Sequence, residues 1–97
     1  METVLIFLAL LNCEPEAPVV PSNDTFFLDG VVYIRPDMLT APVFVHELYH
    51  DCQWLKAGKQ NAKSLAEWRN REYEAMTVES IFNDKHDGLN IKVWYRY

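Results

Sequence analysis

The chain has 97 residues, of which 49% are hydrophobic and 13% aromatic, values typical of one globular domain and not of a disordered chain. The formal net charge is −5, and all nine Lys and Arg lie from Arg35 onward. Phosphate contacts need clustered positive charge, so a nucleic-acid partner is not expected. We expect a single domain over residues 1–97.

An apolar run opens the chain, from Val4 to Leu11. It is far shorter than the roughly 20 residues that span a bilayer, so we expect a buried strand or a short core helix and no membrane association. The run also loosely resembles a lipoprotein signal that ends near Cys13. Export or lipid anchoring is therefore the alternative to a cytoplasmic location.

Two cysteines, Cys13 and Cys52, could form one disulfide, which the sequence does not decide. For Cys52 we expect a buried side chain that packs like a small apolar group rather than a metal ligand.

The segment 14–23 contains Pro15, Pro18 and Pro21, which predict an irregular surface connection. A β-hairpin follows, because Asp29-Gly30 is a two-residue turn signal between the strand-forming runs 26–28 and 31–34.

Two helices come next. Thr40 is a good N-cap for a helix over about residues 41–57 that ends at Gly58. Ser64, with Glu67 three residues later, forms a capping box for a second helix over about residues 65–84. We expect Trp54 and Trp68 to pack these helices together.

The C-terminal segment carries a turn signal at Asp87-Gly88, followed by an alternating pattern over 89–97 that predicts a strand. Its aromatic residues could fold over the site described below as a plug. The complete set of elements predicts an α+β fold, with a small, mostly antiparallel sheet packed on two helices.

The first of these helices contains the segment His46-Glu47-Leu48-Tyr49-His50. Positions i and i+4 lie one turn apart on the same face, so both imidazoles can reach one Zn²⁺ ion at about 2.0–2.1 Å. Glu47 then lies beside the metal, where a general base for a zinc-bound water is needed. The segment predicts two zinc ligands and a catalytic base.

A third ligand must come from elsewhere in the chain. The second helix offers four glutamates, and periodicity does not choose between Glu72 and Glu74, since each shares a face with apolar residues. The four candidates are Glu67, Glu72, Glu74 and Glu79.

The stretches "HELYHDCQ" and "REYEA" together resemble the minimal gluzincin-type zinc metallopeptidases, whose pattern is His-Glu-Leu-x-His-x-x-Gln and later Glu-x-x-Ala. The likeness covers roughly residues 25 to 84 and implies a zincin-like fold, Zn²⁺ as the cofactor and Glu72 as the third ligand, with Glu74 as the alternative. Met76 departs from the related Arg-Glu-x-x-Ala-Asp stretch, in which an acid supports a histidine. Such a carboxylate must here come from another residue or be missing.

The resemblance implies a metallopeptidase that hydrolyses peptide bonds in a peptide or protein substrate, with Glu47 activating the attacking water. Zincins bind substrate along a sheet edge, so Val32 and Tyr33 are candidate substrate-binding residues, although an interior strand is equally compatible with the sequence. Tyr33, Tyr49, Tyr95 and Tyr97 could each donate to an oxyanion or simply pack. Two other classes stay open: a zinc-stapled, non-catalytic interaction domain and a metal-free adaptor.

Overall fold

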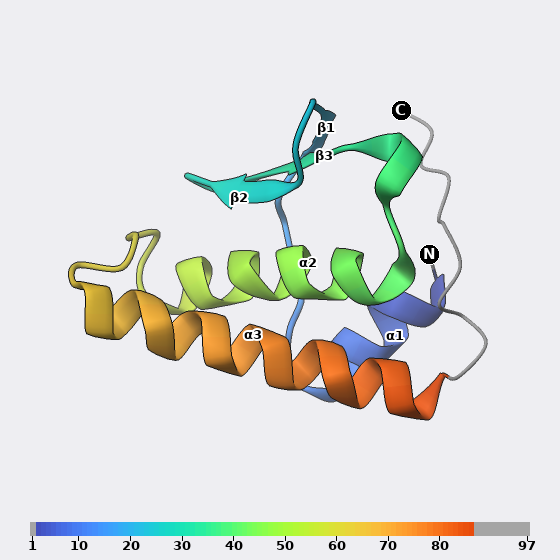
Figure 1. The fold of residues 1–97 in the computed structure, drawn as a ribbon. Helices are drawn as coiled ribbons and strands as arrows, with labels where there is room; N and C mark the ends of the chain where they lie inside the picture. Colours follow the sequence, from blue (N-terminus) through green and yellow to red (C-terminus); the bar gives the residue numbers. More distant parts are fainter. Residues whose placement is uncertain (1, 87–97) are drawn as a thin grey trace.

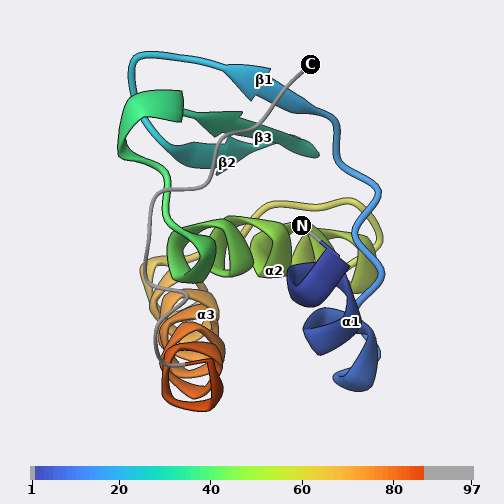
Figure 2. The same cartoon turned by 90° about the vertical axis from the view of Figure 1, so that its right-hand side faces the viewer.

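The computed structural model describes residues 2–86, which form three α-helices and one three-stranded sheet. Figures 1 and 2 show the sheet lying over helix α2 (Ala41–Lys56), with α1 (Glu2–Leu10) and α3 (Leu65–Lys85) on the opposite side of that helix. The α+β expectation is confirmed. The predicted turn at Asp87-Gly88, the strand over 89–97 and the aromatic plug lie outside the described residues.

The sheet has the strand order β1-β3-β2, where β1 is Val19–Pro21, β2 is Phe26–Leu28 and β3 is Val31–Ile34. Strands β2 and β3 pair in the antiparallel sense, and β1 pairs with β3 in the parallel sense. The sheet is therefore mixed, and the prediction of a mostly antiparallel sheet holds for the hairpin alone.

The prediction of an irregular connection over 14–23 is wrong for Val19–Pro21. An edge strand needs hydrogen bonds on one side only, so it tolerates proline. The Pro18 carbonyl accepts from the Val32 N–H at 3.0 Å, and the Ser22 N–H donates to the Ile34 carbonyl at 2.6 Å. Neither bond needs an N–H from a proline.

The hairpin forms where its turn signal predicts. Asp29 and Gly30 both have positive φ, 47° and 79°, as a type I′ turn requires. A Cβ on Gly30 would come within 2.7 Å of the Trp54 ring, so this turn rests directly on α2. The expectation that Trp54 packs the two helices together is wrong. It packs beneath the hairpin instead, with its ring 6.1 Å from that of Phe27.

Both predicted helix starts are confirmed. The Thr40 hydroxyl accepts the Val43 N–H at 3.4 Å, and the Ser64 hydroxyl accepts the Glu67 N–H at 3.1 Å. The Glu67 carboxylate receives the Lys63 N–H rather than the Ser64 N–H of a full capping box. Helix α2 ends one residue before Ala57, and Gly58 follows with a φ of 72°.

The core lies where the lower face of the sheet and helix α1 meet α2. Alternation along β3 directs Val32 and Ile34 onto α2, and both are fully buried. The apolar N-terminal run is a core helix, as expected, although only one side of it is covered. That side carries Val4, Phe7 and Leu8, and the Phe7 ring meets the Phe82 ring of α3 edge-on at 5.1 Å.

A disulfide joins Cys13 to Cys52, across a sequence separation of 39 residues. The sequence left this pairing open, and the structure shows it, because the turn after α1 brings Cys13 against the second half of α2. The same region is held by Asp51, whose fully buried carboxylate accepts the N–H groups of Glu16 and Ala17 at 2.7 and 2.9 Å. Among residues 2–86, none of the helices has the length and apolar character needed to cross a membrane.

Candidate metal centre

His46 and His50 lie one turn apart on α2, and both side chains face α3. Their Nε2 atoms are 3.2 Å apart. The Glu72 carboxylate reaches them from α3, with one oxygen 3.3 Å from His46 Nε2 and the other 2.5 Å from His50 Nε2. The three residues each offer one donor atom, and these atoms all lie within 4.8 Å of one another. This His-His-Glu group could hold a metal ion.

The tautomer of His50 follows from its neighbour Gln53. The Gln53 amide nitrogen donates to the Arg71 carbonyl at 2.9 Å, and a carbonyl can only accept. The Gln53 amide oxygen therefore faces His50 Nδ1, 2.8 Å away, and that nitrogen must carry the proton. His50 Nε2 is left with its lone pair directed at the group.

His46 is oriented in the same way by a carboxylate. Its Nδ1 lies 2.8 Å from Glu79 Oε1 on α3, so Nδ1–H donates to Glu79 and, in the neutral ring, Nε2 presents its lone pair. Glu79 thus occupies the supporting role that Met76 cannot fill. Sequence reasoning did not assign this role to Glu79, although its position seven residues after Glu72, two turns along the same face, was a usable signal.

The donor set fits a cation. Two imidazole lone pairs and a carboxylate converge at 2.5–3.3 Å, while the ring protons point to Glu79 and Gln53. Three acceptors this close repel one another unless a positive charge lies between them. Burial lowers the pKa of His50 and His46 acts in the same direction, whereas the bonds to Gln53 and the Glu72 carboxylate oppose the shift. The neutral ring is the form that binds a metal.

Glu47 is buried beside this group, with 9% of its surface exposed. Burial raises the pKa of its carboxyl from 4.5 to about 7, the charges of Glu72 and Glu79 add to the rise, and His46 opposes it. Within residues 2–86 the Glu47 carboxyl makes no hydrogen bond, so it is free to accept a proton. A carboxyl whose pKa lies near neutrality is suited to general-base chemistry.

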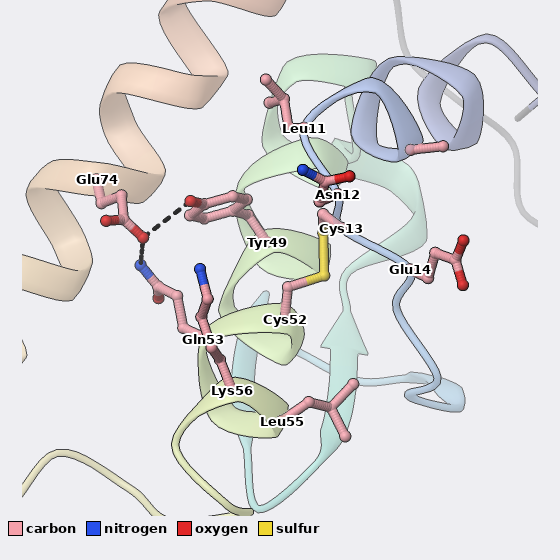
Figure 3. Close-up of a pocket in the computed structure, with 11 residues that line it drawn as sticks. Leu11, Asn12, Cys13, Glu14, Tyr49, Cys52, Gln53, Leu55, Lys56 and Glu74 are labelled. Atoms are coloured by element: carbon pink, nitrogen blue, oxygen red, sulfur yellow. Dashed lines mark hydrogen bonds between the residues drawn. A yellow bond between two sulfur atoms is a disulfide. The ribbon is translucent and has the colours of Figure 1, made fainter.

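The alternative third ligand, Glu74, faces another part of the molecule. One of its oxygens accepts both the Tyr49 hydroxyl, at 2.8 Å, and the Gln53 amide, at 3.2 Å (Figure 3). Burial and this hydrogen bond raise the pKa of Tyr49 to about 12. The contacts favour Glu72 as the ligand and give Tyr49 a partner away from the metal centre. Figure 3 also shows the Cys13–Cys52 bond, which joins α2 to the segment that follows α1.

The two candidate substrate-binding residues lie on β3, and that strand is interior. It pairs with β1 on one side and β2 on the other, so of the two alternatives for Val32 and Tyr33, an open edge and an interior strand, the structure shows the interior strand. Val32 is fully buried against the core, and the Tyr33 ring stacks on Phe26 at 4.7 Å. The strand beside the metal centre is β2, whose Phe27 ring lies 6.4 Å from the His50 ring.

Comparison with protein-family models, curated proteins and solved structures gave no match to this chain.

Proposed function

We propose that this protein is a zinc-dependent metallopeptidase. The observation that supports this most strongly is the convergence of His46, His50 and Glu72, with the buried carboxyl of Glu47 at their side. Two imidazoles and one carboxylate are the protein ligands of many catalytic zinc sites, which keep a fourth position for water or substrate. The same donor set also occurs at non-haem iron sites, but a buried carboxyl beside the three ligands, placed to act as a base, supports hydrolysis.

Each residue has a defined role in the proposed reaction. His46, His50 and Glu72 hold the ion, with Glu79 and Gln53 orienting the two rings. Zinc, when bound, supplies a Lewis acid that polarises the scissile carbonyl and acidifies water. Glu47 accepts the proton of the attacking water and later transfers a proton to the leaving amine.

The substrate backbone would lie along β2 and not along β3. Among the described residues, no strand pairs with the outer side of β2, and this strand adjoins His50 through Phe27. An extended peptide can add to such an edge through its main-chain hydrogen bonds.

Metal content and turnover, measured together, test the proposal. We expect one zinc ion per chain by elemental analysis, a loss of zinc in Glu72→Gln, and zinc retention in the matched variant Glu74→Gln. Glu47→Gln should keep its zinc and lose cleavage of a fluorogenic peptide library. Zinc-free protein purified without chelator, or equal zinc content in Glu72→Gln and Glu74→Gln, would contradict the proposed site.

The same variants separate the two other classes. A zinc-stapled interaction domain would lose stability when zinc is removed. Its wild type would cleave no peptide, so Glu47→Gln would not differ from it in the cleavage assay. Met76, where related sequences have an acid, favours this class, but the Glu79 carboxylate lies 2.8 Å from His46 Nδ1 and offers the acid that Met76 lacks. A metal-free adaptor would show no change in melting temperature on chelator treatment.

For the location we favour export over the cytoplasm, because the Cys13–Cys52 disulfide is suited to an oxidising compartment. Fractionation of cells that express the protein, combined with thiol labelling of both cysteines, tests this. Reduced cysteines in a cytosolic fraction would support the cytoplasm instead.

A further inference from the structure

A recess of about 340 Å³ opens directly beside the metal centre, and His50 and Glu72 form part of its wall. Figure 1 shows the β2–β3 turn, the link between α2 and α3, and the first turns of α3 gathered at this end of the molecule. The other lining side chains that matter are Phe27 and Leu28 of β2, Ala62 of the link and Trp68 of α3.

Trp68 is the largest side chain in the recess. It precedes Glu72 by four residues, so it lies one helical turn away on the same face of α3. The expectation that it packs the helices together is wrong, because 53% of its surface is exposed. An indole ring left open to solvent beside two metal-binding residues can bury apolar surface when a ligand binds.

The polar groups of the recess already have partners within the chain. The Arg71 guanidinium donates to the Glu67 carboxylate at 2.9 Å and to the Gln60 carbonyl at 3.0 Å. The Asn61 amide donates to Asp29 at 2.6 Å. The recess therefore offers a ligand apolar contacts rather than an unpaired charge. Its volume of about 340 Å³ is at the small end of the range for ligand-binding pockets.

Building on the proposed function, we propose that this recess receives one large apolar side chain, aromatic by preference, of a substrate held at the metal centre, and that Trp68 determines this preference. The residue that occupies it adjoins the scissile bond, because His50 and Glu72 belong both to the recess and to the metal centre. Tyr73 is the matched control, since it is an aromatic residue of the same helix with 70% exposure and does not line the recess.

The test uses two metal-chelating probes, the hydroxamates of N-acetyl-phenylalanine and N-acetyl-alanine, titrated calorimetrically into zinc-loaded protein. Burying a benzyl group in place of a methyl group should strengthen binding to the wild type about tenfold or more. Trp68→Ala should reduce this ratio to about twofold or less, whereas Trp68→Phe and Tyr73→Ala should retain most of it.

Zinc content is measured first, which separates the two ways to fail. Protein that takes up no zinc overturns the proposed function and this inference with it. Zinc-loaded wild type that binds both probes equally, or a benzyl preference that survives Trp68→Ala, overturns the inference alone and leaves the metal centre in place.

Discussion

The contact between Glu79 and His46 leads to the most discriminating prediction about the metal centre. In the wild type, His46 Nδ1 lies 2.8 Å from Glu79 Oε1. Glu79→Gln removes the charge of this carboxylate but keeps an oxygen that can still accept the His46 Nδ1–H. Glu79→Ala removes both the charge and the acceptor. The two variants therefore separate the electrostatic contribution from the orienting contribution.

The size of the effect follows from the surroundings of the pair. Loss of an outer-shell carboxylate typically costs 10- to 100-fold in metal affinity. The Glu79 side chain is 32% exposed, so solvent weakens its interaction with the ring. We expect zinc affinity to fall about tenfold in Glu79→Gln, which is roughly 1.4 kcal/mol, and towards 100-fold in Glu79→Ala.

Competition against a chromophoric zinc chelator at constant pH and salt measures these affinities. Glu67→Gln is the matched control, because Glu67 is an acid of the same helix that pairs with Arg71 and not with a histidine. Circular dichroism should show unchanged helix content in each variant. If zinc affinity in both Glu79 variants stays within twofold of wild type, or if Glu67→Gln weakens it equally, the supporting role of Glu79 is refuted.

Three further predictions concern stability. In zinc-free protein, Glu47→Gln should be more stable than wild type at pH 8 by up to about 3 kcal/mol, since the folded wild type must ionise a carboxyl whose pKa is about 7. This difference should disappear as the pH falls to 4.5, the ordinary pKa of the group, and denaturant unfolding at both pH values measures it. Asp51→Ala should lower the free energy of unfolding by about 3 kcal/mol, because two backbone N–H groups lose a charged acceptor; an unchanged denaturant midpoint would contradict this. Reduction of Cys13–Cys52 should cost roughly 4 kcal/mol for a closed loop of this length, seen as a melting temperature at least about 10 °C lower, and a Cys13→Ser/Cys52→Ser variant should then be insensitive to reductant.

Sequence alone predicted the local elements and the His46–His50 pair of the candidate metal centre. The starts of α2 and α3 depend on Thr40 and Ser64, whose hydroxyls bond N–H groups three residues away. The hairpin depends on the positive φ of Asp29-Gly30, and the His46–His50 pair depends only on helical periodicity. Each of these signals acts within four residues, so each can be read without knowing the rest of the fold.

Only the tertiary structure decided which of Glu72 and Glu74 faces the two histidines, and it alone gave the contact of Glu79 with His46, the disulfide and the parallel pairing of β1. The carboxylate that reaches the histidines depends on how α3 is rotated about its axis against α2, and Glu74, two residues further on, points to Tyr49 instead. Cys13 and Cys52 are 39 positions apart, and β1 pairs with β3 although β2 lies between them in the sequence. These contacts depend on packing between segments distant in the chain, which neither periodicity nor capping residues encode.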